Sequence, residues 1–305
     1  APEGLSLPDL LPEVNMSQGR IEKTVQLLSL ESPAPIAKQD GRWQLTAADL
    51  GDGFWERARR LTELRRREQE QLQRYVDLAS GHMEYLIEAL DGDATMVQPP
   101  TLPPLPAAPR MELVNEAVTF LRRTDRPLEP RKQWPAGLSK KGRIPKDRLA
   151  EVGRALCIWK DAGWGSLVHQ GMYLDGAFSD ELVEACAKLV RRWQPMPAPT
   201  WVTCVPSTRH PDLVPGFARR LAAALGLPFV ASLEKAEERP QQKTMTNSTQ
   251  QARNVDGAFS VVAIPPSGPV LLVDDLVHSG WTMTTAAWLL REAGAEAVFP
   301  LALAT

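Results

Sequence analysis

The side chains best suited to chemistry gather near the C-terminus, in residues 268–283. An apolar run at 270–273 is followed at once by two acids, Asp274 and Asp275. In open α/β sheets, ligands bind at the edge where the strands end. We therefore expect both carboxylates at such an edge, where they can meet a ligand.

A short loop follows the two acids and contains the small or hydroxyl residues Ser279, Gly280 and Thr282. A helix is expected after it, over residues 282–293, with Gly294 as its natural end. The first turn of a helix offers free N–H groups and the positive end of the helix dipole, which together favour a phosphate. The loop is thus predicted to bind a phosphate group.

Two carboxylates beside a phosphate are unfavourable unless the ligand brings hydrogen-bond donors or a cation. Ribose hydroxyls donate well to carboxylates, and Mg2+ can offset the negative charge. The residues therefore indicate a site for a ribose 5-phosphate. The alternative is an ordinary strand end followed by a capped helix, since acids at strand ends and Thr at helix starts are common.

The elements that position this loop follow a repeating pattern. From residue 147 onward, helical and strand patterns alternate, as in a mainly parallel sheet flanked by helices. The expected helices are 182–193, 213–225 and 282–293, and the expected strands are 201–205, 228–231, 270–273 and 297–303. The predicted fold class of this part is α/β.

The N-terminal part shows a different pattern. Apolar spacing predicts a helix at 17–30, and two β-like stretches, 35–38 and 42–45, flank an Asp-Gly turn. A helix followed by a basic hairpin is what the end of a winged-helix module looks like. The candidate DNA contacts on or beside this wing are Lys38, Arg42 and Trp43.

A long helix is expected next, from residue 54 to about 90, with an interruption at residues 80–81. The residues predicted to form its buried stripe are Trp55, Ala58, Leu61, Leu64, Leu72 and Tyr75. Six prolines between residues 98 and 109 predict an extended linker. The expected parts are a winged-helix-like and helical module (1–97), a Pro-rich linker (98–110), a basic connector (111–150) and the α/β domain (151–305).

Charge is distributed unevenly along the chain. The formal net charge is only -2, yet residues 120–148 hold ten Lys or Arg against three acids. Such a block either contacts nucleic acid or forms a solvated, loop-rich face. The candidate DNA contacts within it are Arg131, Lys132, Trp134, Lys140, Lys141 and Arg143, with Trp134 the one able to stack on a base.

The loop at 268–283 resembles the signature of type I phosphoribosyltransferases, and within that class it is most similar to the ComF-like branch. Further residues that support the resemblance are Gln250, Arg253, Asn254, Gly257, Ala258, Phe259 and Val205-Pro206-Ser207. The resemblance implies a ligand, phosphoribosyl pyrophosphate, accompanied by Mg2+.

The same resemblance implies roles for individual residues. The catalytic acids Asp274 and Asp275 would bind the ribose hydroxyls. The residues that would hold the 5-phosphate are His278, Ser279, Gly280, Trp281 and Thr282, and those on the pyrophosphate loop would be Ser207, Thr208 and Arg209. His278 and Trp281 depart from the family pattern, because a small hydroxyl residue is usual at the first position and the second is bulky beside a phosphate.

Longer strings resemble the C-terminal half of bacterial RecQ-like DNA helicases that carry a phosphoribosyltransferase domain after the motor. These strings are residues 19–22, 129–135, 161–165, 201–211 and 279–282. The resemblance implies a parent enzyme that hydrolyses ATP to unwind DNA. The chain has no Gly-x-x-x-x-Gly-Lys-Ser/Thr loop and does not begin with Met, so we expect it to be a fragment without the motor.

Members of that subgroup carry a four-cysteine zinc site in the region that matches residues 81–105. No cysteine precedes Cys157 in this chain, so we expect no zinc, because a structural zinc site needs about four soft ligands. The three widely spaced cysteines are expected to be reduced thiols. No apolar run reaches the roughly 20 residues of a membrane helix, so we expect a cytoplasmic protein without a membrane partner.

Two kinds of function remain open. The first, ranked higher, is the accessory region of a RecQ-like helicase that binds DNA through its wing and basic segment and carries a phosphoribosyltransferase-like domain. The second is an active, Mg2+-dependent phosphoribosyltransferase, or a catalytically silent domain that senses a nucleotide or serves for docking.

Overall fold

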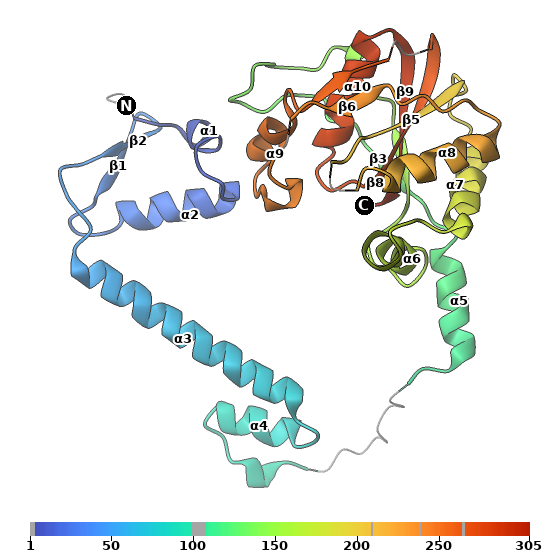
Figure 1. Ribbon diagram of the computed structural model, residues 1–305. Helices are drawn as coiled ribbons and strands as arrows, with labels where there is room; N and C mark the ends of the chain where they lie inside the picture. The colour runs from blue at the N-terminus through green and yellow to red at the C-terminus, as the bar shows by residue number, and fades with distance from the viewer. Residues whose placement is uncertain (1–3, 99–107, 209, 238, 264–265) are drawn as a thin grey trace. The chain divides into compact units, whose positions relative to one another are not determined.

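The computed structural model describes every residue except 1–3, 99–107, 209, 238 and 264–265 (Figure 1). The chain divides into two compact units. The first unit comprises Ala1–Gly4 and Thr24–Pro109, and the second comprises Leu5–Lys23 and Arg110–Thr305. Most of the expected linker at 98–110 lies outside the described residues. A short N-terminal segment therefore belongs with the C-terminal half of the chain.

The second unit is built on a five-stranded sheet with the order β3-β4-β9-β8-β5. The strands are β3 (Arg126–Leu128), β4 (Gly153–Cys157), β5 (Trp201–Cys204), β8 (Gly268–Leu276) and β9 (Ala295–Ala304). Strand β3 pairs antiparallel with β4, and all other neighbours in this sheet are parallel. The predicted α/β class with a mainly parallel sheet is confirmed.

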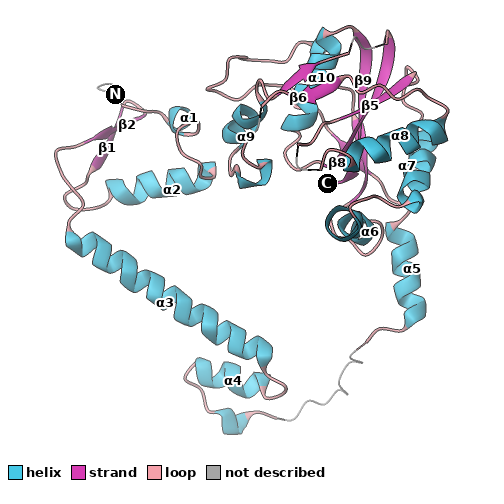
Figure 2. Cartoon of the chain, viewed as in Figure 1, coloured by secondary structure: helices cyan, strands magenta, loops and turns pink. Residues whose placement is uncertain are grey.

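Helices cover both faces of this sheet (Figure 2). Helices α7 (Asp180–Trp193) and α8 (Leu213–Leu225) share one apolar cluster with the sheet. Helices α9 (Ser248–Val255) and α10 (Trp281–Glu292) belong to a second cluster on the other face. Because successive side chains of a strand point to opposite faces, a strand between two helical layers must be apolar throughout.

Strand β8 shows this double burial directly. Leu271 and Val273 belong to the first cluster, and Val270 and Leu272 belong to the second. All four are fully buried. The unbroken apolar run of the sequence is therefore explained by a strand that is covered on both faces.

The remaining elements of the second unit are short. They are α1 (Leu7–Leu10), α5 (Met111–Leu121), η2 (Lys146–Arg148), α6 (Gly165–Gln170), the π-helical turn η3 (Gly171–Asp175), β6 (Leu233–Lys235), η4 (Gln242–Thr244) and β7 (Phe259–Val261). Helix α2 (Gln18–Ser29) spans the division between the units. Strands β6 and β7 form an antiparallel pair of their own.

Helix α8 has the predicted bounds, and Gly226 ends it with φ 71° in the left-handed region that favours glycine. The predicted strand at 228–231 is wrong. Phe229 makes only one isolated bridge, to Val202. Strand β4 and helices α6 and α9 were not anticipated, because each is too short to show a clear apolar period.

The first unit contains β1 (Ile36–Gln39), β2 (Arg42–Leu45), α3 (Asp52–Asp77), α4 (His82–Ala89) and η1 (Ala94–Met96). The predicted hairpin is confirmed, since β1 pairs antiparallel with β2. Its turn residues Asp40 and Gly41 both have positive φ, 50° and 78°, as the tight primed hairpin turns require. A complete winged-helix module is not shown.

The buried stripe expected along α3 is wrong. Helix α3 has no buried residue, and Trp55, Leu61, Leu64 and Leu72 are 51%, 55%, 44% and 63% exposed. Helix α4 contacts α3 near the C-terminal end of α3, where Tyr85 donates a hydrogen bond to the carbonyl of Gln71. An amphipathic pattern predicts a face able to pack, and within the described part of this unit that face has little to pack against.

The basic segment at 131–145 is less irregular than expected. It closes on itself through hydrogen bonds from the N–H of Trp134 to the Gly142 carbonyl and from the N–H of Ile144 to the Lys132 carbonyl, both 2.9 Å. The side chains of Trp134, Leu138 and Ile144 are buried in the second apolar cluster. The segment is therefore part of the domain's core on this face of the sheet.

The three cysteines are buried and unpaired. Burial raises the pKa of the Cys157 and Cys204 thiols to about 12 and raises the pKa of Cys186 as well. All three are therefore protonated at neutral pH. No helix among the described residues is long and apolar enough to cross a membrane.

Candidate functional site

A cavity of about 750 Å³ opens where β5 and β8 end. It collects eight of the residues expected to bind phosphoribosyl pyrophosphate: Ser207, Thr208, Asp274, Asp275, His278, Ser279, Gly280 and Thr282. Arg209 lies outside the described residues. Parallel strands bring their carboxyl ends to one edge of the sheet, and so segments about 70 residues apart in sequence line one cavity.

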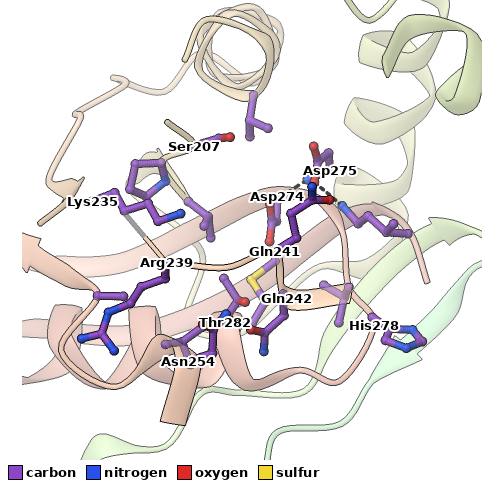
Figure 3. Close-up of a pocket in the computed structure, with 18 of the residues that line it drawn as sticks. Ser207, Lys235, Arg239, Gln241, Gln242, Asn254, Asp274, Asp275, His278 and Thr282 are labelled. Carbon is purple, nitrogen blue, oxygen red and sulfur yellow. Dashed lines mark hydrogen bonds between the residues drawn. The ribbon is translucent and has the colours of Figure 1, made fainter. Parts of the chain in front are cut away.

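Asp274 and Asp275 form the acidic floor of this cavity (Figure 3). Asp274 is only 7% exposed. The N–H of Asp275 donates to Oδ1 of Asp274 (2.9 Å), and the N–H of Leu276 donates to Oδ1 of Asp275 (2.6 Å). Burial raises the pKa of both carboxyls, and the neighbouring Asp275 raises that of Asp274 further. Two crowded, desolvated acids favour a ligand that brings donors or positive charge.

The phosphate loop leads from β8 into α10. Gly280 caps α10 with φ 78°, a left-handed conformation that costs glycine little and other residues more. The helix begins at Trp281, so the N–H groups of its first turn lie beside the cavity that Gly280 and Thr282 line. The His278 side chain is exposed at the same rim. This is the geometry of an anion site at a helix start.

Trp281 does not obstruct this cavity. Its side chain is 2% exposed and is absent from the described lining. The indole stacks on Trp134 with ring centroids 5.6 Å apart and an interplanar angle of 19°, and its Nε1 donates to the Ser248 hydroxyl at 2.9 Å. The bulky residue that departs from the family pattern therefore packs beneath the loop, and only its backbone is available to a ligand.

A basic and polar wall also lines the cavity, and of its members only Asn254 was expected from the sequence. Its members are Lys235, Arg239, Gln241, Gln242 and Asn254. Figure 3 shows Lys235 and Arg239 on one side of the pocket and His278 on the other. Lys235 ends β6, a strand of three residues that gives no periodic signal. Arg239, Gln241 and Gln242 follow that strand, and Asn254 lies in α9. The sequence held one signal for this wall, the pair Lys235 and Arg239 shortly before the supporting residues at 250–259.

Arg239 in this wall is incompletely paired. It forms an ion pair with Glu237 at 2.6 Å, but its buried Nε has no hydrogen-bond partner within the described part of the chain. An unmet buried donor carries a free-energy cost unless a ligand satisfies it. Arg239 therefore contributes a positive charge to the cavity lining and has one buried N–H that no described residue accepts.

His210 also lines the cavity. Its charge acts to lower the pKa of Asp275, against the larger effect of burial. Trp159 and Tyr173 line the same cavity and contact each other, with ring centroids 6.1 Å apart. These residues are far apart in sequence, with Tyr173 in η3, so only folding brings all of them together.

The residues that support the family resemblance have two structural roles. Asn254, Ala258 and Phe259 line the cavity. Gln250 and Arg253 instead hold the N-terminal segment, since both donate to the Pro12 carbonyl, at 2.5 and 3.2 Å.

Asn247 makes the firmest contact to the same segment. Its Nδ2 donates to the carbonyls of Leu11, Val14 and Met16 at 3.2, 3.0 and 2.9 Å. Its Oδ1 accepts from the N–H of Gln250, which caps α9. One buried amide therefore joins the segment to the helix behind the basic wall.

The expected DNA contacts are divided between the two units. Lys38 and Trp43 face each other across the hairpin, with Nζ 5.4 Å from the ring centre, and Arg42 donates to the Gly4 carbonyl. Those in the basic segment belong to the second unit, where Lys132, Lys141 and Arg143 are exposed.

Three other candidates in the basic segment are engaged within the domain. Trp134 is 5% exposed and covered by Trp281, which leaves its ring unavailable for stacking on a base. Lys140 pairs with Asp256 at 2.8 Å, and Arg131 donates to the Ser279 carbonyl at 2.8 Å.

The α/β fold, with its mainly parallel sheet and flanking helices, is consistent with a type I phosphoribosyltransferase domain. The family model described as "Phosphoribosyl transferase domain" matches residues 216–303, so a phosphoribosyltransferase domain is present in this chain. The match runs from α8 through the two acids and the phosphate loop to β9. No curated protein matches the chain.

Two solved structures are similar over part of their length. Adenine phosphoribosyltransferase from Leishmania tarentolae is 24% identical, with 40% of this chain and 56% of that chain covered and a TM-score of 0.28. The corresponding enzyme from Leishmania donovani is 18% identical, with 60% and 65% covered and a TM-score of 0.29. The chain thus spans less than two thirds of either relative.

Proposed function

We propose that the cavity binds phosphoribosyl pyrophosphate together with Mg2+. The observation that carries this proposal is a pair of adjacent acids, the buried Asp274 and the half-buried Asp275, between a helix-start anion site and a basic wall. A phosphorylated sugar with a second anionic group matches that order of charges. Its hydroxyls supply donors to the acids, and its two phosphate ends meet the loop and the wall.

Each part of the ligand has a place in this proposal. Asp274 and Asp275 accept hydrogen bonds from the ribose hydroxyls. The 5-phosphate accepts hydrogen bonds from the loop N–H groups between His278 and Thr282. Ser207 and Thr208, with Arg239 opposite, receive the pyrophosphate, and this satisfies the unpaired Nε of Arg239.

The donor set suits Mg2+, which prefers oxygen ligands and is commonly held by one or two carboxylates plus the phosphates of a substrate. Asp274 and Asp275 are the carboxylates that line the cavity, and burial is the main cause of their raised pKa values. A bound cation would favour their charged forms. No group of three or more His, Cys, Asp or Glu within the described ranges forms a metal site by itself. The cation, when bound, neutralises charge on the leaving pyrophosphate. The expectation of no zinc stays a prediction.

In catalysis, a nitrogen nucleophile would form a bond to C1 of the ribose while the bond from C1 to the pyrophosphate oxygen breaks. The bonding electron pair leaves with the pyrophosphate, and the nucleophile's proton passes to water. Positive charge that develops on the ribose is stabilised by the two carboxylates, which are fixed before the reaction begins.

Calorimetry with phosphoribosyl pyrophosphate and Mg2+ tests the binding proposal. We expect wild type to bind and the double variant Asp274→Asn/Asp275→Asn to lose about 100-fold or more in affinity, the scale for removal of charged hydrogen bonds. The matched control is Glu292→Gln, an acid at the far end of α10. Wild type without heat, or a double variant with equal heat, would contradict the proposal. Release of pyrophosphate with a base then separates transfer from mere ligand sensing.

We further propose that the chain is the accessory region of a RecQ-like DNA helicase, located in the cytoplasm, and that it binds DNA. The hairpin with Lys38, Arg42 and Trp43 and the exposed Lys132, Lys141 and Arg143 support this. Phosphate contacts make affinity depend steeply on salt. We expect forked DNA to bind in fluorescence anisotropy at low salt and to be released as salt rises. An absence of binding at low salt would exclude this role for the chain.

A further inference from the structure

Arg131 lies against the back of the phosphate loop. Its Nε donates to the backbone carbonyl of Ser279 at 2.8 Å, and its guanidinium carbon lies 5.4 Å from the ring centre of Trp281. It comes from the basic segment, 148 residues earlier in the chain. No feature of the family match at 216–303 includes it.

Two cavities lie on either side of this loop. The main cavity holds the two acids, and a second cavity of about 340 Å³ is lined by Arg131. Residues 277–280 line both cavities, so they form the wall between them. Arg131 is in the lining of the second cavity and is absent from that of the first.

Because the peptide bond is planar, the direction of the Ser279 carbonyl also fixes the direction of the Gly280 N–H. In a trans peptide, the carbonyl of one residue and the N–H of the next point in opposite directions. The Ser279 carbonyl is directed toward Arg131, on the side of the second cavity. The N–H of Gly280 is therefore directed toward the main cavity, where an anion needs a donor.

The surrounding aromatic packing fixes Arg131 and the loop together. Trp281 is stacked on Trp134 and is hydrogen-bonded to Ser248, so the residue after Gly280 cannot rotate freely. Gly280 itself has φ 78°, and without other contacts a glycine has many alternative conformations. The flexibility of Gly280 would leave the Ser279–Gly280 peptide free to rotate, and the hydrogen bond from Arg131 restricts it.

We propose that Arg131 is a positioning residue, which holds the Ser279–Gly280 peptide so that its N–H faces the 5-phosphate of the ligand. This inference rests on the proposed binding of phosphoribosyl pyrophosphate. Arg131, a residue of the basic segment, thus acts on the sugar-phosphate site through its hydrogen bond to the loop. Its guanidinium makes no direct contact with the ligand in this proposal.

Two ligand fragments test this role, because they occupy opposite ends of the cavity. Ribose 5-phosphate probes the phosphate loop, and Mg2+-pyrophosphate probes the wall of Lys235 and Arg239. We expect Arg131→Ala to weaken ribose 5-phosphate roughly tenfold, the scale of one charge-assisted hydrogen bond. Pyrophosphate affinity should stay unchanged. A merely structural effect would instead lower both affinities together.

A conservative variant and a matched control complete the experiment. Arg131→Gln keeps an N–H donor for the Ser279 carbonyl without the charge, so we expect it to recover most of the lost affinity. It also serves if Arg131→Ala does not fold. Arg123→Ala removes an exposed charge after α5 and should change neither affinity.

The outcomes separate this inference from the proposal beneath it. If wild type binds neither fragment, the proposed ligand is wrong. If wild type binds both and Arg131→Ala binds both equally well, Arg131 does not position the loop. Equal weakening of both fragments, or no recovery in Arg131→Gln, also overturns the inference.

Discussion

Helices α8 and α3 carry similar apolar stripes but meet different surroundings. Helix α8 has 13 residues and buries six of them, whereas α3 has 26 residues and buries none. Helix α8 packs on a parallel sheet and on α7, and α3 contacts little more than α4 within its own unit. A periodic pattern identifies the face that can be buried, but a partner element determines whether burial occurs.

A matched pair of truncations should show the largest difference between these two helices. Leu221→Ala on α8 removes a fully buried side chain, and we expect a loss of about 2–5 kcal/mol in the free energy of unfolding. Leu72→Ala on α3 removes a side chain that is 63% exposed, and we expect a change within about 0.5 kcal/mol.

Urea denaturation followed by circular dichroism measures both changes. If Leu72→Ala costs as much as Leu221→Ala, α3 is packed against something in solution, and the contrast between the two helices fails. Leucine and alanine are both strong helix formers, so helix propensity changes little in either variant.

The same contrast explains how much of the fold could be predicted from the sequence. Helices α8 and α10 were predicted nearly to the residue, because long helices have strong patterns. The apolar centre of strand β8 was predicted at 270–273, but the strand extends from Gly268 to Leu276. The hairpin at 36–45 was predicted from its Asp-Gly turn, a signal that depends on backbone geometry alone. Burial along α3 was not predictable, since it depends on a neighbour.

The site was predictable in part, for a related reason. The acids and phosphate loop are contiguous in sequence, so their order alone indicated a ligand. Lys235 and Arg239 come from the end of β6 and the residues just after it, and His210 comes from a different loop. No local spacing connects them to Asp274. Trp281 looked like an obstruction because its partner, Trp134, is distant in sequence.

Helix α9 sharpens the comparison, because it is shorter than α3 and yet is firmly held. Asn247 is 6% exposed and joins α9 to three carbonyls of residues 11–16. We expect Asn247→Ala to cost about 2 kcal/mol, since it leaves acceptors unpaired and removes the helix cap. Hydrogen exchange should increase both in residues 11–16 and in α9.

Asn247→Asp serves as the control for the cap. An aspartate retains an oxygen for the N–H of Gln250 but loses the donors to the N-terminal segment. We expect it to be as destabilising as alanine or more so, because a carboxylate would face carbonyl oxygens. Near wild-type stability in Asn247→Asp would show that only the cap matters and that residues 11–16 are not held by this side chain.

The smallest expected effect has the opposite sign and concerns the centre of the proposed site. Burial and the neighbouring Asp275 raise the pKa of Asp274 in the folded protein. Between the unfolded carboxyl pKa, about 4, and the raised folded value, the native state binds more protons than the unfolded state. The free energy of unfolding therefore falls as pH rises through this window.

Asp274→Asn removes this titration while keeping a side chain of similar shape. We expect it to stabilise the ligand-free protein at pH 7 by on the order of 1 kcal/mol, and to flatten the decline of stability above pH 4. Thermal or urea unfolding between pH 4 and 8 measures both effects, with Asp212→Asn as the control on an exposed acid. A variant less stable than wild type at pH 7 would show that the acid is well compensated without ligand. A more stable variant would show that the domain maintains an unfavourable charge where the proposed ligand binds. Helices α3 and α4 of the first unit bury no residue, so they carry no such cost in folding free energy.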